Sequence, residues 1–300
     1  MKILILGATG MLGSECRRVF SRNHEVISPD KTELDITSWD GVIDIFQRLL
    51  PDIVINCAGF TDLKACEKED FAVRKINIEG PRNLAQGCAR FERKLVHISS
   101  DYVFDGRKMF PQPYFEDDIP NPLSAYGKSK KDSEIAVRDN SPNYIIIRTG
   151  WLYGINGDNF VKSIVTRAIR KKTKMLRIPD DQFGSPTWAY RVALEAVKLL
   201  DVDARGTYHI TSEGYCSRYE WAKYILNKLG INASLEPCSL KDVQGAVKKP
   251  ANCILENRSL KTQGLNTMNE WKKDISLFLK NFGERLIKEA ETKDNQERTA

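Results

Sequence analysis

Tyr126 and Lys130 lie four residues apart in the segment AYGKSK, and they are the residues around which the sequence is best understood. On a helix, side chains at i and i+4 share one face, with Cβ atoms roughly 5–6 Å apart. A lysine ammonium at that separation favours the ionised phenol and lowers the tyrosine pKa from its usual value of about 10. The pair therefore predicts a tyrosine that donates a proton to a carbonyl, or takes one from an alcohol, near neutral pH.

A hydroxyl group at the end of a predicted strand is the second chemical feature. The apolar run at 95–98 (LVHI) predicts a buried strand, and Ser99 and Ser100 follow it directly, where their hydroxyls can bond a substrate oxygen. A Tyr–Lys pair alone also fits an ordinary solvated helix face. The strand-end hydroxyl, the order of the segments and a glycine-rich turn at the N-terminus favour the catalytic interpretation.

The N-terminal segment has the order strand, glycine-rich turn, helix. Residues 2–6 (KILIL) predict a strand, Gly7, Gly10 and Gly13 follow, and residues 14–20 continue as a helix. Glycines let the backbone approach a pyrophosphate, which sits at the positive N-terminus of the following helix. This context predicts a dinucleotide site, although the spacing is G-x-x-G-x-x-G and not G-x-G-x-x-G.

Two residues of opposite charge follow the second predicted strand, at 24–28. An acidic residue about twenty positions past the glycines can bond the adenosine ribose 2′-hydroxyl of NAD, whereas a basic residue accommodates the 2′-phosphate of NADP. Asp30 and Lys31 point to opposite choices. We expect NADPH as the cofactor, with NADH tolerated.

The elements that must position these residues alternate between strand and helix as far as about residue 150. Helices are predicted at 38–49 and within 67–91, and strands at 51–56, 94–99 and 144–148. This alternation is typical of an α/β fold with a doubly wound parallel sheet. Later elements follow less regularly: an aromatic loop at 149–154, helices at 159–172, 188–200, 217–229 and 268–285, and a strand at 206–210.

Composition excludes several classes of protein. No apolar run approaches the roughly 18 residues of a membrane span, and the N-terminus is a first strand and not a signal peptide. The seven cysteines are odd in number and include no Cys-x-x-Cys, which argues against a disulfide framework and a zinc ribbon. A reducing cytoplasm is the expected location.

The net charge and the histidine content limit the classes of ligand that we expect. The three histidines are widely spaced, so a histidine-based metal site is not expected. The net charge of +6 is mild, and no nucleic-acid-binding signature is present. We expect no nucleic-acid or membrane partner, and an anionic small molecule suits the charge.

Ten segments, in order, resemble the extended short-chain dehydrogenase/reductase superfamily, and within it the dTDP-4-dehydrorhamnose reductases. They are GATGMLGSE, LDIT, PDIVINCAG, NIEGPRNLA, HISSDYVFDG, AYGKSK, RTGWLYG, DQFGSPT, GTYHIT and PANCILEN, and they span about residues 1–280. The resemblance implies reduction of dTDP-4-dehydro-β-L-rhamnose to dTDP-β-L-rhamnose with NAD(P)H. The expected assembly is a monomer or a homodimer.

The predicted organisation is two lobes and a tail. Residues 1–150, with about 175–200, are expected to form the NAD(P)-binding Rossmann domain. Residues 151–174 and 201–285 are expected to form a smaller C-terminal substrate-binding lobe. Residues 286–300 are mostly polar and predict a flexible, frayed tail.

The resemblance also implies a role for each matching residue. Ser100, Tyr126 and Lys130 match the catalytic residues, with Tyr126 as proton donor. The implied cofactor-binding residues are Gly7, Thr9, Gly10, Met11, Leu12, Gly13, Asp30, Lys31, Asp35, Ile36, Cys57, Ala58, Gly59, Asn77, Tyr126 and Lys130. The implied substrate-binding residues are Thr61, Leu63, Ser100, Asp101, Tyr102, Val103, Trp151, Asn159 and Lys249, with Trp151 as a stacking surface.

Three positions depart from the family pattern. Lys249 stands where arginine is common, which keeps the charge and loses the bidentate fork. Lys64 stands where an acidic residue is frequent. Some relatives are described with a magnesium ion at carboxylates; Glu15 matches one such position, but Tyr190 occupies another, so no metal is predicted.

Other functions fit parts of the pattern. A sugar-nucleotide 4,6-dehydratase needs an Asp-Glu pair after the strand-end hydroxyl, and this chain has Asp101-Tyr102. A C4 epimerase is harder to exclude by chemistry, although RTGWLYG and DQFGSPT resemble the reductases more. A non-catalytic NADP-binding subunit, like the methionine adenosyltransferase regulatory beta subunit, is also open; the intact Ser100, Tyr126 and Lys130 favour an enzyme.

Overall fold

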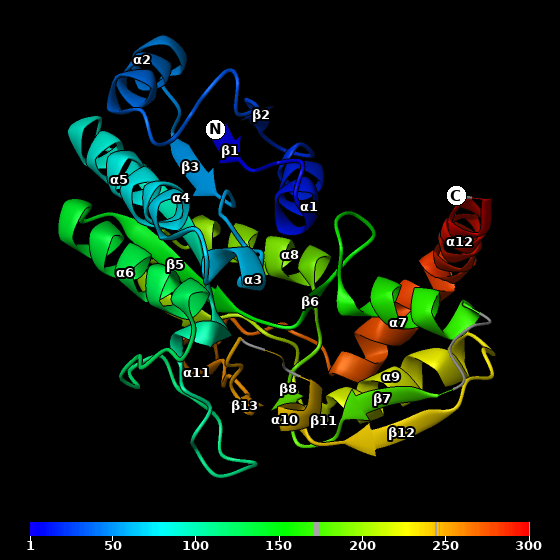
Figure 1. Ribbon diagram of the computed structural model, residues 1–300. Helices are drawn as coiled ribbons and strands as arrows, with labels where there is room; N and C mark the ends of the chain where they lie inside the picture. The colour runs from blue at the N-terminus through cyan, green and yellow to red at the C-terminus, as the bar shows by residue number, and fades with distance from the viewer. Residues whose placement is uncertain (171–174, 244, 246, 300) are drawn as a thin grey trace.

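The computed structural model describes residues 1–170, 175–243, 245 and 247–299. Its centre is a six-stranded sheet in the order β10-β5-β4-β3-β1-β2 (Figure 1). Every neighbouring pair is parallel, so the doubly wound α/β fold expected from the sequence is confirmed. The strands are β1 (Lys2–Leu6), β2 (Glu25–Ile27), β3 (Ile53–Asn56), β4 (Lys94–Ser100), β5 (Tyr144–Thr149) and β10 (Gly206–His209).

Helices cover both faces of this sheet, which explains why its strands are apolar on both sides. On one face Ile3 and Ile5 pack in a core with α1 (Met11–Phe20) and α8 (Ala189–Asp201). On the other face Leu4 and Leu6 share a core with three further helices. These are α2 (Trp39–Leu49), α5 (Gly80–Arg90) and α6 (Ala125–Asn140) (Figure 1).

The strand order reverses between β1 and β3. The chain moves from β1 outward to β2 on one side and then returns to β3 on the other side. Loops leaving such a point diverge and open a crevice at the carboxyl ends of the strands, where ligands bind in open α/β sheets. Gly7 follows β1 and Cys57 follows β3, so predicted cofactor residues lie on both walls of this crevice.

A second hydrophobic core lies beside the sheet and is built from residues beyond 150. Its helices are α7 (Phe160–Ile169), α9 (Arg218–Lys228) and α12 (Trp271–Thr299). Three small sheets accompany them: β6-β9, β7-β12 and β11-β8-β13 (Figure 1). The remaining bounds are β6 (Leu152–Tyr153), β7 (Leu176–Pro179), β8 (Phe183–Gly184), β9 (Thr187–Trp188), α10 (Leu240–Val243), β11 (Cys216–Ser217), β12 (Leu235–Cys238), β13 (Asn252–Cys253) and α11 (Arg258–Thr262).

Some segments lie in a different part of the fold from the one expected. β10, expected in the smaller lobe, pairs with β5 at the edge of the central sheet. Leu176 and Ile178, expected with the cofactor domain, pack in the second core. A short apolar strand carries no local signal of which sheet it joins, which explains both differences. The helix expected at 159–172 ends at Ile169, and 171–172 lie outside the described residues.

The C-terminal segment is helical where the sequence predicts a frayed tail, so that prediction is wrong. α12 continues to Thr299, and Leu286 and Ala290 are only 2% and 1% exposed. Together with Phe278 and Phe282 they form a stripe at i, i+4 spacing that packs into the second core. The polar residues around this stripe concealed it in the sequence.

Candidate active site

A cavity of about 840 Å³ lies at the carboxyl edge of the central sheet, with walls from both halves of the chain. This volume suits a small-molecule site. The predicted site residues that line it are Gly10, Met11, Leu12, Cys57, Ala58, Gly59, Thr61, Leu63, Ser100, Asp101, Tyr102, Tyr126, Lys130, Trp151 and Lys249. One cavity therefore brings together residues predicted for catalysis, for the cofactor and for the substrate.

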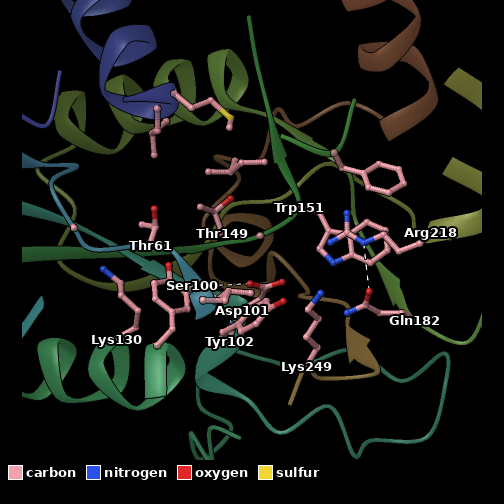
Figure 2. A pocket seen from close by; sticks show the side chains of 18 of the residues that line it. Thr61, Ser100, Asp101, Tyr102, Lys130, Thr149, Trp151, Gln182, Arg218 and Lys249 are labelled. Atoms are coloured by element: carbon pink, nitrogen blue, oxygen red, sulfur yellow. Dashed lines mark hydrogen bonds between the residues drawn. The ribbon is translucent and has the colours of Figure 1, made fainter. Parts of the chain in front are cut away.

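The three predicted catalytic residues meet in this cavity. Ser100 ends β4, and Tyr126 and Lys130 lie one turn apart near the start of α6. The hydroxyl of Ser124 accepts a hydrogen bond from Gly127 N, so α6 begins immediately before Tyr126. Figure 2 shows Ser100 and Lys130 close together on one side of the cavity.

The phenol of Tyr126 does not have the lowered pKa that the spacing predicts. Burial raises the pKa of Tyr126; the Ser100 hydroxyl opposes this shift and the Asp101 carboxyl adds to it. Lys130 Nζ instead donates to Ile98 O at 2.5 Å, and burial lowers its own pKa to about 8. Desolvation of the ring is the largest cause of this shift, and Lys130 is not among the charges that move the pKa of Tyr126. Tyr126 is a protonated phenol at neutral pH.

Ser100 is hydrogen-bonded to its neighbour Asp101. Ser100 Oγ donates to Asp101 Oδ1 at 2.8 Å and accepts from Tyr102 N at 3.2 Å. The other oxygen of Asp101, Oδ2, is buried without a hydrogen-bond partner among the described residues. Burial raises the pKa of Asp101 to about 6, while Ser100 and then Arg218 oppose the shift. This carboxyl group titrates close to physiological pH.

A buried polar chain connects β3, β4 and α6 beneath the site. Asn56 Nδ2 lies 3.2 Å from His97 Nδ1, and His97 Nε2 lies 3.0 Å from Ser133 Oγ, which donates to Lys130 O at 2.7 Å. Burial, and then the charge of Lys130, lower the pKa of His97 well below its usual value. The neutral ring can accept at one nitrogen and donate at the other. The chain fixes the backbone at Lys130, and because its members come from three elements, no sequence pattern revealed it.

The glycine turn after β1 fits a dinucleotide pyrophosphate. Gly7 has a φ of +70°, and a Cβ there would lie 2.7 Å from Ala58 N. A Cβ at Gly13 would lie 2.1 Å from Gly7 O, so the start of α1 is held against the crevice. The cap residue Gly10 provides no side-chain hydrogen bond, which leaves the first amides of α1 available to an anion. Gly7, Thr9 and Gly13 do not themselves line the cavity.

The predicted adenine-end residues lie beyond the end of β2, outside the cavity. Asp30 Oδ1 accepts from Thr32 N at 2.7 Å, and Asp35 Oδ1 accepts from Thr37 N at 2.9 Å. Hydrogen bonds within these turns lower the pKa of both carboxyl groups. Lys31 is exposed. Ile36 packs against Gly80 in the core and does not line the cavity.

Asn77 supports the loop after β3 and does not line the cavity. It lies in a π-helical turn (η1, Lys75–Glu79) that separates α4 (Asp70–Arg74) from α5, within the segment where the sequence predicts helix. Its Oδ1 accepts from Phe60 N at 2.7 Å, and its Nδ2 donates to Phe60 O and to Ser129 Oγ. π turns are frequent at functional sites. These hydrogen bonds tie the loop to α6, and the predicted contact of Asn77 with the cofactor stays a prediction.

Two predicted substrate residues do not reach the cavity. Val103 is fully buried in a small core with Phe104. Asn159 caps α7: its Oδ1 accepts from Lys162 N at 3.1 Å and its Nδ2 donates to Gly154 O at 2.8 Å. Both side chains are structural in this fold, because a resemblance in sequence places a segment and not the direction of its side chain.

Trp151 is not a free stacking surface. The guanidinium of Arg218 lies 3.6 Å from the centre of its ring, and a Cβ on Gly184 would lie 2.4 Å from the ring. Trp151 is therefore only 6% exposed. A ligand in the cavity meets an indole and a guanidinium side by side.

Several residues that line the cavity were not among the predicted site residues, including Thr149, Gly150, Gln182 and Arg218. Thr149 ends β5 and Gly150 follows it, at the carboxyl edge of the sheet where ligands bind in such folds, so this rule could have found both. Thr149 Oγ1 is buried without a hydrogen-bond partner in the described chain. Gln182 and Arg218 reach the cavity from the second core, whose packing no local pattern predicts.

Glu15, the carboxylate considered for a metal, is paired with an arginine. Arg18 Nη2 lies 2.7 Å from Glu15 Oε2, and the Arg18 guanidinium lies 4.2 Å from the centre of the Tyr190 ring. Among the described residues, no group of three or more His, Cys, Asp and Glu side chains is arranged to hold a metal ion. No helix in the described part of the chain is both long and apolar enough to cross a bilayer.

Known proteins are similar to this chain in sequence and in fold. Spore coat polysaccharide biosynthesis protein SpsK of Bacillus subtilis is 36% identical over 279 residues, covering 93% of this chain and 96% of that protein. A dTDP-4-dehydrorhamnose reductase from Clostridium acetobutylicum has a TM-score of 0.90 at 38% identity, over 94% of this chain and 100% of that chain. The Bacillus anthracis dTDP-4-dehydrorhamnose reductase, solved in complex with NADP, has a TM-score of 0.89 at 33% identity, over 93% and 99% of the two chains.

The family is shown by a match over almost the whole chain. Residues 1–284 fit the family model described as RmlD substrate binding domain. The match includes the glycine turn, the residues of the cavity and most of the second core. This protein therefore belongs to the RmlD substrate binding domain family.

Proposed function

We propose that this protein uses NADPH to reduce the 4-keto group of a dTDP-linked sugar, converting dTDP-4-dehydro-β-L-rhamnose to dTDP-β-L-rhamnose. The observation that carries the proposal is the meeting of Ser100, Tyr126 and Lys130 with the start of α1 in one cavity. Two similar structures are named dTDP-4-dehydrorhamnose reductase, and one of them contains NADP, which supports the choice of substrate and cofactor.

The protein's part in this reaction is proton transfer and charge stabilisation. Bound NADPH supplies a hydride to the carbonyl carbon. Tyr126 gives its phenolic proton to the ketone oxygen, where negative charge develops. Its raised pKa keeps that proton in place until the charge appears. Ser100 exchanges its hydrogen bond to Asp101 Oδ1 for one to the same oxygen.

Lys130 holds positive charge near the phenol. Its pKa of about 8 leaves most of the ammonium protonated at neutral pH. Once Tyr126 has lost its proton, this charge stabilises the phenolate. The hydrogen bond to Ile98 O and the chain from Asn56 keep the lysine in position.

NADPH is the proposed cofactor because of the charged side chains that follow β2 in the chain. Asp30 and Asp35 both bind backbone amides of their own turns, and the Asp30 contacts would compete with a ribose 2′-hydroxyl. Lys31 is exposed beside them and can pair with a 2′-phosphate. NADH is then tolerated but bound more weakly.

The second core is proposed to act as the substrate lobe, in a monomer or a homodimer. It supplies Arg218 and Gln182 to the cavity, opposite the catalytic residues. The cysteines of the chain are free thiols, which suits a reducing compartment, and we place the reaction in the cytoplasm.

The test is NADPH oxidation with a panel of nucleotide-linked 4-keto sugars. We expect turnover with dTDP-4-dehydro-β-L-rhamnose and a loss of roughly 10²- to 10⁴-fold in Tyr126→Phe, with NADPH affinity retained. Tyr144→Phe is the matched control, since Tyr144 begins β5 at the far end of the strand from the cavity. Near-normal turnover in Tyr126→Phe contradicts the proposed role. No turnover with any sugar, together with tight binding to a methionine adenosyltransferase, favours a regulatory subunit.

A further inference from the structure

Arg218 is a charged side chain in the cavity without a carboxylate partner. It begins α9, and its guanidinium lies 3.6 Å from the Trp151 ring centre and 5.0 Å from that of Phe160. Its Nε donates a long hydrogen bond of 3.4 Å to Gln182 Oε1. Both Nη groups lack a hydrogen-bond partner among the described residues, and Asp101 lies beyond ion-pair distance. The guanidinium is oriented by its neighbours, and the Asp101 carboxyl attracts it without forming an ion pair.

Other positive charge lies close to Arg218. Gln182, which accepts from Arg218, donates its Nε2 to Pro250 O at 3.1 Å and so connects Arg218 to the segment of Lys249. Burial lowers the pKa of Lys249, and the charges of Arg218 and Lys64 lower it further. Figure 2 shows Arg218, Gln182 and Lys249 gathered on the side of the cavity away from Lys130. An anion bound beside these groups would reduce the repulsion between the positive charges of Arg218 and Lys249.

The chemistry of this group selects a phosphate-bearing anion. A guanidinium presents a planar fork that binds two phosphate oxygens at once, whereas lysine acts as a point charge. Stacking on Trp151 fixes the plane of the fork in advance. The pyrophosphate of a dinucleotide has its own place at the start of α1, so the anion at Arg218 belongs to a different molecule.

We propose that Arg218 binds the diphosphate of the nucleotide-sugar substrate through its two Nη groups and sets the affinity for that substrate. This inference rests on the proposed function and adds to it the residue that recognises the diphosphate. With the diphosphate at Arg218, the sugar extends past Trp151 toward Ser100 and Tyr126. Arg218 is then a binding residue whose loss affects KM far more than kcat.

The test measures binding of dTDP and of thymidine to the full-length protein saturated with NADP⁺, by titration calorimetry. Arg218→Met should weaken dTDP binding roughly 10- to 100-fold, as expected for lost charged hydrogen bonds, and leave thymidine and NADPH affinity unchanged. The KM of the sugar nucleotide should rise by a similar factor, with kcat nearly kept. Arg285→Met is the matched control: Arg285 lies on α12, does not line the cavity and pairs with Glu289 at 2.7 Å, so a loss below about 3-fold is expected.

Arg218→Lys is the control in case Arg218→Met fails to fold, because lysine keeps the positive charge and most of the packing. It should recover part of the dTDP affinity; affinity equal to wild type shows that the fork is not needed and overturns the proposal. Unchanged dTDP binding in Arg218→Met also overturns it, as does an equal loss for thymidine or NADPH. If the wild type turns over the sugar and KM is unchanged in Arg218→Met, this inference alone fails. If the wild type neither binds dTDP nor shows turnover, the proposed function fails with it.

Discussion

Replacing Asp101 by asparagine should stabilise the folded protein above pH 6. Asp101 is 3% exposed, and burial raises its pKa from 3.8 to about 6. This shift of about 2 pKa units, at about 1.4 kcal/mol per unit, means that the ionised carboxylate costs the folded state about 3 kcal/mol. Desolvation is the reason, and the Ser100 hydroxyl, the Arg218 charge and the Cys253 thiol offset it only in part.

The direction of the pH dependence follows from where the proton is held more tightly. Between pH 4 and pH 6 the folded protein binds the Asp101 proton and the unfolded chain does not, so stability falls as the pH rises through this window. Above about pH 6 both states are ionised and the cost is constant. Below about pH 4 both are protonated and the cost is absent.

Asparagine keeps part of the local geometry. Its Oδ1 still accepts from Ser100 Oγ, while its amide takes the place of Oδ2 and meets the tight contact with Gly150, where a Cβ would lie 2.3 Å from Oδ2. An unsatisfied amide offsets some of the gain. We therefore expect Asp101→Asn to be about 1–3 kcal/mol more stable than wild type at pH 8, and no more stable at pH 4.

Urea unfolding at the two pH values measures this difference. Asp132→Asn is the matched control, because Asp132 is exposed on α6 and should change stability by less than about 0.5 kcal/mol at either pH. A variant no more stable than wild type at pH 8 refutes the argument. So does a stability difference that is the same at both pH values.

Two further changes test other parts of the structure. Lys31→Ala should weaken NADPH binding several-fold, as for one lost exposed charge contact, while NADH affinity, measured by fluorescence titration, stays the same; equal losses for the two cofactors would remove the argument from Asp30 and Lys31. Leu286→Ala should lower the free energy of unfolding by about 2–5 kcal/mol, because Leu286 is 2% exposed in the second core. Leu277→Ala, on the same helix but 41% exposed, should cost less than half as much, and similar losses in both variants would show that the end of α12 is not packed.

The sequence predicted the features that local patterns encode. The apolar runs located the strands of the central sheet, except that β10 was assigned to the other lobe, and the glycine spacing located the turn before α1. The spacing of Tyr126 and Lys130 correctly placed both on one helix facing the cavity. These predictions agree with the structure because each depends only on residues that are close together in the sequence.

Features that depend on tertiary packing could not be predicted in this way. The pKa of Tyr126 moved in the opposite direction because desolvation depends on everything that surrounds the ring. Arg218 reaches the cavity from a helix that lies nearly a hundred residues after Tyr126 in the chain. No sequence motif predicted that Arg218 would line the cavity. Asn77 lies in a predicted segment but faces Phe60 and Ser129, which only the folded chain brings together.

The hydrogen-bonded chain from Asn56 through His97 to Ser133 has a consequence for how this protein can diversify. The proton-handling groups are anchored in the interior of the parallel sheet, whereas Gln182 and Arg218 are anchored in the separate second core. Mutations that enlarge or shrink the far wall of the cavity can therefore accumulate while the hydrogen bonds that hold Lys130 are kept. The same catalytic residues can therefore be combined with a changed substrate-binding wall that accepts other sugar nucleotides. Redesign of substrate specificity should begin in the second core.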